Sequence, residues 1–216
     1  MGKPKGKVKI KWSPEFAYAI GLLTTDGCLS SDFRHIDLTS KDREQLENFL
    51  YCLKIENKIS LKHSGSGNKY LRVQVGDVNF YKFLLSIGLT PKKSKTLKSV
   101  TVPSKYFFDF LRGSLDGDGC FYSYWDPRWR SSYMFYLGFC SASKNHIDWL
   151  QKEIYDRLKI VGHITKSKIR ICYQLKYAKK DSLKLLKNVY YLPSVISLSR
   201  KKLKINKALA IIGEKI

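Results

Sequence analysis

The stretch "GSLDGDGC" at residues 113–120 places two aspartates among three glycines, directly after a run that otherwise has the character of an apolar helix. A similar stretch, "GLLTTDGC", stands at residues 21–28. Acidic side chains are disfavoured at the C-terminal end of a helix, which carries the negative pole of the helix dipole. The presence of Asp26 and Asp118 at two such ends therefore needs a chemical reason.

The two stretches belong to an internal duplication of the chain. Asp26 and Asp118 lie 92 residues apart, and each is followed by the same order of segments: a strand pair, a helix, another strand pair and a helix. The sequence therefore predicts an α/β (α+β) fold of two pseudo-symmetric αββαββα repeats with antiparallel sheets. The charged, proline-ended segment "LKSVTVPS" predicts the boundary, which gives repeats over residues 1–100 and 101–216.

Local patterns support these elements. Ser13 followed by Pro14 is typical of a helix start, and Gly27 and Gly119 are predicted to close their helices in the left-handed conformation. "YLRVQV" at 70–75 and "KIRICYQLK" at 168–176 alternate between apolar and polar residues, which predicts strands with one buried face and one basic, amide-rich face. Two helical apolar stripes should pack in the core: Leu46, Phe49, Leu50 and Leu53, and Ile147, Leu150, Ile154 and Leu158.

Charge is the strongest bulk signal. Forty Lys and Arg residues against eighteen Asp and Glu leave a formal net charge of +22, which indicates a polyanionic partner and favours nucleic acid. No apolar run approaches the roughly 18 residues of a membrane helix, and no secretory signal is evident. The five cysteines form no C-x-x-C pair, which argues against a zinc ribbon or a disulfide framework. We expect a cytoplasmic, nucleoid-associated or organellar protein that is not secreted and has no membrane partner.

The two helices that end in the aspartates should pack on each other. Gly21 and Thr25 share one helix face, as do Gly113 and Gly117, and small residues at this spacing allow two backbones to approach closely. Such packing would bring the two carboxylates side by side, where they repel unless a cation lies between them. A single Asp-Gly is more often a turn, but a pair at equivalent repeat positions favours a site for a hard divalent ion such as Mg²⁺.

These residues resemble a known family. "AIGLLTTDG" (19–27) and "LRGSLDGDG" (111–119) are similar to the two signature motifs of a LAGLIDADG homing endonuclease of the monomeric, two-repeat type. Thr24 replaces the first acid in one copy, and Arg112 and Ser114 replace apolar residues in the other. The resemblance implies that the motif helices pack at the centre, that the sheets form a DNA-binding saddle, and that the protein acts as a monomer.

The resemblance also implies a mechanism: hydrolysis of both strands of a long, asymmetric double-stranded DNA target across the minor groove with Mg²⁺, in sites that Mn²⁺ or Ca²⁺ can also occupy. Asp26 and Asp118 would hold the metal, with the backbone near Thr25 and Gly117 as further ligands. Outer polar positions fall on Ser40 and Ser143, for which helix capping is the alternative. Lys93 and Lys201 would stabilise developing negative charge, unless they only contact phosphate or lie on the surface.

The polar sheet faces would read the major groove, with arginine suited to guanine and glutamine to adenine. Lysines, including Lys166, would position the backbone. The predicted DNA contacts are His35, Asp37, Lys41, Lys62, Lys69, Tyr70, Arg72, Gln74, Tyr122, Tyr124, Asp126, Arg128, Arg130, Lys144, Lys168, Arg170, Gln174 and Lys176.

Two other functions remain open at this stage. An intron RNA maturase with the same fold would also be basic, and so would a catalytically silent DNA-binding regulator. Asp26 and Asp118 favour the nuclease, because a protein that only binds nucleic acid has no need to keep repelling carboxylates together. A regulator would also be expected to carry a helix-turn-helix segment, for which we find no spare length. In the habit of the family, an intron-encoded product is expected rather than an intein.

Overall fold

The computed structural model describes residues 6–63, 67, 69–167 and 171–216. The N-terminal repeat contains α1 (Pro14–Thr25), β1 (Gly27–Leu29), β2 (His35–Ser40), α2 (Arg43–Leu53), β3 (Ile59–His63), β4 (Lys69–Gly76) and α3 (Val78–Ser86). The C-terminal repeat contains α4 (Phe107–Asp116), β5 (Cys120–Trp125), β6 (Tyr133–Ser141), α5 (Lys144–Leu158), β7 (His163–Lys166), β8 (Tyr173–Tyr177), α6 (Lys179–Val189) and α7 (Ser199–Ile211). The short 3-10 turns η1 (Lys93–Lys95) and η2 (Ser104–Tyr106) lie between them.

The two repeats have the same sheet topology. Within the described residues the strands form two four-stranded antiparallel sheets, in the orders β1-β2-β4-β3 and β5-β6-β8-β7. The predicted fold of two αββαββα repeats is thus confirmed, with α7 as an addition at the C-terminal side. None of the described helices is long and apolar enough to cross a membrane.

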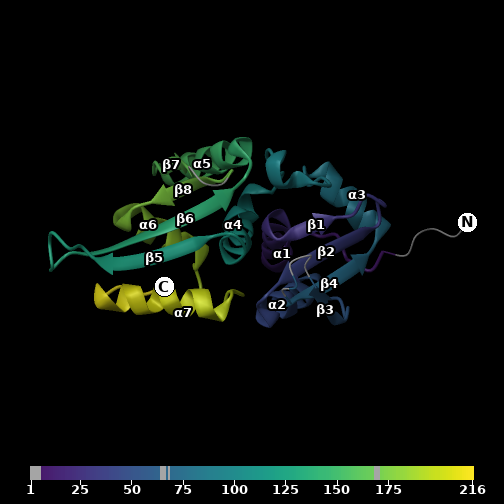
Figure 1. The fold of residues 1–216 in the computed structure, drawn as a ribbon, viewed down its shortest axis with the longest axis horizontal. Helices are drawn as coiled ribbons and strands as arrows, with labels where there is room; N and C mark the ends of the chain where they lie inside the picture. The colour runs from purple at the N-terminus through teal and green to yellow at the C-terminus, as the bar shows by residue number, and fades with distance from the viewer. Residues whose placement is uncertain (1–5, 64–66, 68, 168–170) are drawn as a thin grey trace, which may run out of the picture.

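Helices α1 and α4 pack side by side between the two sheets (Figure 1). Their contact is made by backbone. A Cβ atom at Gly21 would overlap the carbonyl oxygen of Phe110, and one at Gly113 would overlap the carbonyl oxygen of Tyr18. The small residues therefore serve the close helix contact that their spacing predicts, and they set how near the two helix ends come to each other.

The glycines after the helices have a different role from the predicted one. Gly27 and Gly119 are not among the described residues with positive φ, so the prediction of a left-handed closing residue is wrong. Each lies where the chain passes directly from helix to strand. A Cβ atom there would overlap the carbonyl oxygen of Leu23 or Leu115 in the preceding helix. Glycine is required by crowding against the last helical turn.

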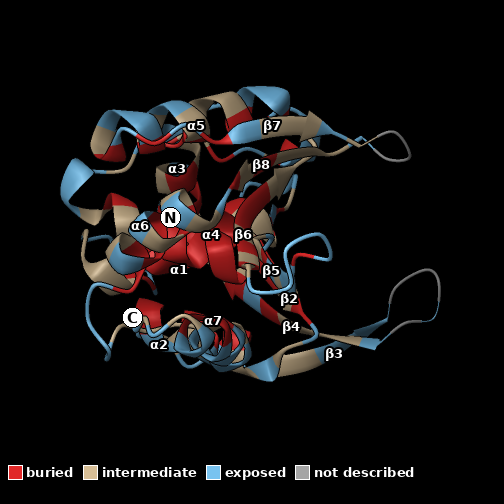
Figure 2. Cartoon of the chain, turned by 90° about the vertical axis from the view of Figure 1, so that its left-hand side faces the viewer, coloured by how far each residue is buried: buried red, intermediate tan, exposed pale blue. Residues whose placement is uncertain are grey.

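The core runs through both repeats. Residues 16–24 of α1 are all buried, and so are the predicted stripes on α2 and α5, apart from the half-buried Leu50. Ile171 was expected on an apolar strand face, but it lies before β8 begins and is 59% exposed. Figure 2 shows the buried centre at α1 and α4, with the β3–β4 and β7–β8 hairpins projecting to the same side of the molecule. This arrangement gives the saddle its two arms.

A buried polar network distinguishes the C-terminal motif helix. Arg112, one of the departures from the motif, is 1% exposed and pairs with Asp109 at 2.8 Å. Its guanidinium also donates to the carbonyl oxygens of Val189 and Ile196. The arginine therefore fastens α4 to the segment that leads into α7, because a buried guanidinium must have its donors satisfied.

Candidate functional site

Asp26 and Asp118 stand at the adjoining C-terminal ends of α1 and α4. A Cβ atom at Gly117 would lie 3.0 Å from Asp26 Oδ2, so the carboxylate of one motif reaches the helix end of the other. Desolvation, and next the neighbouring charge of Asp118, raise the pKa of Asp26 to about 6. Desolvation also raises the pKa of Asp118. The two carboxylates are therefore close enough to disfavour each other's ionisation in the absence of a cation.

Lys93 and Lys201 both bind the backbone at these helix ends. Lys93 Nζ donates to Gly27 O at 2.7 Å and to Thr25 O at 3.3 Å. Lys201 Nζ donates to the carbonyl oxygens of Leu115, Gly117 and Gly119 at 2.7, 2.8 and 2.8 Å. Each lysine thus caps a negative helix end beside an aspartate. Burial lowers the pKa of both lysines, and the aspartate charges oppose that shift.

A residue that the sequence analysis missed fixes Asp26. Gln45, in the first turn of α2, is 3% exposed and donates through Nε2 to Asp26 Oδ2 at 2.6 Å. Its Oε1 accepts from Ser40 Oγ at 2.7 Å, and that hydroxyl in turn accepts from the backbone N–H of Asp42. Ser40 therefore reaches the aspartate only through Gln45, and its hydroxyl accepts from the N–H of Asp42, the N-cap residue of α2.

His146 holds the corresponding place in the C-terminal repeat. The Ser141 hydroxyl accepts from the backbone N–H of Ser143, as the Ser40 hydroxyl accepts from that of Asp42. Ser141 therefore corresponds to Ser40, and His146 follows Ser141 by the same five positions by which Gln45 follows Ser40. His146 Nδ1 donates to Lys98 O at 2.8 Å, which leaves Nε2 as the acceptor of the neutral ring. Burial lowers the pKa of His146 to about 4. With Asp118 and Thr25 it lines a cavity of about 10 Å³, the size of one water.

The placement of an outer site residue at Ser143 is corrected by this geometry. Ser143 is buried, and its hydroxyl donates to Leu97 O at 2.5 Å. That bond joins α5 to the segment between the repeats. The hydroxyl also makes no capping bond to α5, so neither sequence-based interpretation of Ser143 describes its contact.

The donor set at the paired helix ends fits a hard cation. Among the described residues no group of three or more His, Cys, Asp or Glu side chains could hold a metal. Mg²⁺, however, is commonly bound through one or two carboxylates and completes its shell with water and substrate phosphates. Asp26 and Asp118 supply two carboxylates whose pKa values are raised chiefly by burial. The carbonyl oxygens of Thr25 and Gly117 each accept from a lysine and retain a second lone pair.

The outer face of the N-terminal sheet carries most of its predicted contacts. Arg72 NH1 lies 3.7 Å from Asp37 Oδ2, and Gln74 is exposed next to them on β4. His35 Nδ1 lies 2.5 Å from Asp32 Oδ2. Three lysines predicted to contact DNA are also exposed: Lys41, Lys62 and Lys69. Lys41 Nζ lies 5.5 Å from the centroid of the Tyr70 ring.

The C-terminal sheet differs in chemistry. Tyr122 and Tyr124 are exposed on β5, and Gln174 and Lys176 are half-buried on β8. Asp126 is buried and accepts from the backbone and guanidinium of Arg128, so it closes the hairpin and does not face outward. Three further residues predicted to contact DNA are exposed: Arg130, Lys144 and Lys166. Lys144 Nζ lies 2.6 Å from Asp148 Oδ2. Lys168 and Arg170 lie outside the described residues.

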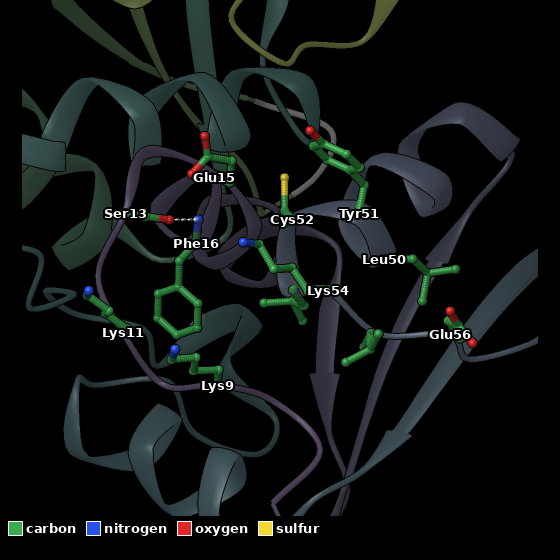
Figure 3. A pocket seen from close by; sticks show the side chains of 12 residues that line it. Lys9, Lys11, Ser13, Glu15, Phe16, Leu50, Tyr51, Cys52, Lys54 and Glu56 are labelled. Carbon is green, nitrogen blue, oxygen red and sulfur yellow. Dashed lines mark hydrogen bonds between the residues drawn. The ribbon is translucent and has the colours of Figure 1, made fainter.

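A cleft in the described part of the chain lies away from the aspartates. It has a volume of about 760 Å³ and is lined by Lys9, Lys11 and residues 50–56 at the end of α2 (Figure 3). Ser13, at its edge, caps α1 through a 3.1 Å bond from the N–H of Phe16. The cleft is therefore at the start of α1, whereas Asp26 follows its end, roughly 18 Å along the helix axis. None of the predicted site residues lines it.

The fold and the site define a two-repeat protein in which paired helices present two carboxylates between two saddle-shaped sheets. Residues 13–88 match the family model described as LAGLIDADG-like domain. The chain therefore has the LAGLIDADG fold in its two-repeat form, as the motifs predicted. No curated protein sequence matches the chain.

Solved structures share this fold at low identity. The chain is similar to the meganuclease I-SmaMI bound to uncleavable DNA, with a TM-score of 0.60 and 12% identity over 93% of this chain and 92% of that one. It is similar to the homing endonuclease I-WcaI bound to its DNA recognition sequence, with a TM-score of 0.59 and 15% identity over 86% and 85%. Full-length DUF199/WhiA from Thermatoga maritima matches with a TM-score of 0.58 and 17% identity over 96% of this chain, which spans 64% of that protein's length. Homing endonucleases and DUF199/WhiA share this fold, so the fold alone does not define an activity. The activity of this chain has to be argued from its site.

Proposed function

We propose that the chain is a site-specific homing endonuclease that cuts both strands of a long, asymmetric DNA duplex as a monomer, with Mg²⁺ as the metal. The observation that carries the proposal is the pair Asp26 and Asp118, held at adjoining helix ends where burial raises the pKa of both and the charge of Asp118 further raises that of Asp26. A protein that only bound nucleic acid would be more stable without this repulsion. A bound cation relieves it.

The chain's own residues divide the work at this centre. Asp26 and Asp118 would hold the cation, and Gln45 orients the carboxylate of Asp26. Lys93 and Lys201 keep positive charge beside the place where phosphate would bind and neutralise the helix ends. When bound, a divalent cation supplies an activated water and stabilises the leaving oxygen.

The sheets provide a surface of the right charge for duplex DNA. The chain has a formal net charge of +22, and the hairpins of both sheets project to the same side (Figure 2). Structures that share the fold, I-WcaI and I-SmaMI, are described as bound to DNA. Because the two sheets carry different side chains, a single chain would read an asymmetric target without a partner subunit.

The test is cleavage of a pooled library of DNA duplexes by the purified chain, with Mg²⁺ and separately with Ca²⁺. We expect Mg²⁺-dependent cutting at one long site, and loss of at least about 10³-fold in rate for Asp26→Asn and for Asp118→Asn. Asp148→Asn is the matched control, because Asp148 is a surface carboxylate paired with Lys144. Tight duplex binding without cutting in Mg²⁺ or Mn²⁺ would contradict the proposal and make the RNA maturase the next function to test.

A further inference from the structure

The segment that leads into α7, residues 196–201, crosses between the two repeats, and α7 lies beside α2 (Figure 1). Every residue of this segment makes a hydrogen bond, and the bonds go to both repeats. The partners on α4 are Arg112 for Ile196 O, Asp116 for the Leu198 N–H and the last carbonyls for Lys201. The partners on α2 and its N-cap are Asn48 for Ser197 O, Glu44 for the Ser199 N–H and Asp42 for Arg200.

Arg200 makes the contact with the most defined geometry. Its NH2 lies 2.6 Å from Asp42 Oδ2 and its Nε lies 3.0 Å from Asp42 Oδ1, so both carboxylate oxygens are engaged. Asp42 is the N-cap residue of α2, a position from which aspartate usually bonds its own helix, yet its side chain makes no capping bond. The carboxylate therefore holds the other repeat and not its own helix.

Hydrogen bonds lead from this pair to both carboxylates of the site. The Asp42 N–H donates to Ser40 Oγ at 3.0 Å, and Ser40 Oγ donates to Gln45, which in turn donates to Asp26. On the other side, Lys201 follows Arg200 directly in the chain and donates to the carbonyl oxygens around the end of α4, beside Asp118. Arg200 thus stands between the groups that orient Asp26 and the lysine beside Asp118.

The segment between the repeats makes the reverse crossing. Ser143 and His146, at the start of α5, bond to the carbonyl oxygens of Leu97 and Lys98. The Leu97 N–H donates to Lys93 O at 2.8 Å. The segment that carries each capping lysine is therefore docked on the second helix of the other repeat. The crossing at α5 uses neutral groups, whereas the crossing at α2 uses a charged pair that substitution can remove.

We propose that Arg200 is a positioning residue for both half-sites. Through Asp42 it joins the helix that carries Gln45 to the helix that carries Lys201, so that the two strands of the target are cut in a coupled way. This inference rests on the proposed function. The side chains of Arg200 and Asp42 are 58% and 28% exposed, and exposed pairs contribute little to stability. The effect of the pair is therefore expected in the geometry of the site.

The experiment measures cleavage in Mg²⁺ of a duplex labelled differently on its two strands. Arg200→Ala and Asp42→Ala should each slow both strands by about 10-fold. The double variant should be no slower than either single one, because the two side chains act as one pair. Arg43→Ala is the matched control and should leave both rates unchanged, since it removes an exposed arginine whose 2.8 Å pair with Glu47 stays within α2. The Kd for the duplex in Ca²⁺ and the urea midpoint should be unchanged in every variant.

Other roles of Arg200 give different patterns. An arginine that bound a DNA phosphate would weaken the Kd when replaced, whereas Asp42→Ala would leave the Kd and the cleavage rates unchanged. A purely structural pair would lower the urea midpoint together with the rates. Either pattern would overturn the inference, and so would slowing of one strand only or effects that multiply in the double variant.

A measurement without DNA or metal separates this inference from the proposed function. The Ser199 N–H donates to Glu44 across the repeats at 2.9 Å. Asp42→Ala should speed amide hydrogen exchange at Ser199 by roughly 10-fold, whereas Arg43→Ala should not. Unchanged exchange would overturn the inference even in a chain that cuts DNA. Faster exchange in a chain that cuts no duplex with Mg²⁺ or Mn²⁺ would support the link between the repeats and contradict the proposed function.

Discussion

Asp26 and Asp118 occupy equivalent ends of paired helices, yet their neighbours differ. Asp26 accepts a direct 2.6 Å bond from Gln45, while Asp118 and His146 line the same cavity of about 10 Å³. What the repeats share is the backbone and the lysine that caps each helix end. What differs is the polar side chain beside each carboxylate. The duplication therefore kept the frame of the site and left the polar surroundings of each carboxylate free to differ.

The largest effect is expected from a change at the contact between α1 and α4, which the two repeats share. Gly21→Ala would place a Cβ against the carbonyl oxygen of Phe110, so α1 and α4 would have to separate. We expect a loss of more than about 4 kcal/mol in the free energy of unfolding, because backbone cannot move aside as a side chain can. Urea denaturation followed by circular dichroism measures it, with Gly6→Ala as control, since the nearest atom there is 3.5 Å away. A loss below 1 kcal/mol would contradict the backbone contact.

The next effect tests a feature that only one half possesses. Arg112 lies 92 residues after Ile20, and both are buried in their motif helices. Arg112→Leu would leave Asp109 buried with no positive charge beside it and only the hydroxyl of Tyr191 as a donor, at a cost of about 3–5 kcal/mol in the free energy of unfolding. Arg112→Leu combined with Asp109→Leu should recover most of this loss in the same denaturation assay. A double variant as unstable as the single one would show that the arginine acts through its carbonyl contacts instead.

A smaller effect sharpens the comparison of the two carboxylates and depends on the proposed nuclease activity. Gln45→Ala should slow cleavage of one DNA strand by about 10–100-fold, because the orientation of Asp26 is lost. His146→Ala should slow the other strand by less, since the hydrogen bond of His146 goes to Lys98 O and the residue shares only a cavity lining with Asp118. A duplex labelled differently on its two strands gives both rates in one reaction. Equal slowing of both strands by either variant would show that the two half-sites act as one.

The smallest effect concerns pH in the protein without metal. The pKa of Asp26 is raised from 3.8 to about 6, so the stability linked to its protonated form is full below about pH 4 and is lost as pH rises through 6. Asp26→Asn should therefore raise the Tm by about 2–4 °C at pH 7.5 and leave it unchanged at pH 4. Thermal unfolding in a chelator measures this, with Asp148→Asn as control. A lower Tm at pH 7.5 would contradict the repulsion.

The fold could be predicted because its determinants are local and repeated. Helix-period stripes, alternating strands and two copies of one motif are visible in the sequence, and so is the small-residue face that pairs α1 with α4. The conformation of Gly27 was not predictable in this way, because the crowding that requires glycine comes from a carbonyl oxygen in the preceding helical turn.

The polar side chains near Asp26 and Asp118 were harder to predict. Matching Ser40-Lys41 with Ser143-Lys144 aligns the repeats two residues away from the register that the strands adopt, in which Ser40 corresponds to Ser141. The same misalignment prevents Gln45 and His146 from being recognised as equivalent positions.

The burial of α1 has a consequence for the synthesis of the chain. Residues 16–24 are buried on every side, and part of that cover comes from α4, which begins at Phe107. On a ribosome that adds about 5–20 residues per second, α1 waits roughly 5–20 s for its partner helix. During that interval the N-terminal repeat exposes an apolar helix face that includes Gly21, where the backbone has no side chain to cover it. The nascent protein should therefore depend on chaperones until the second motif has emerged.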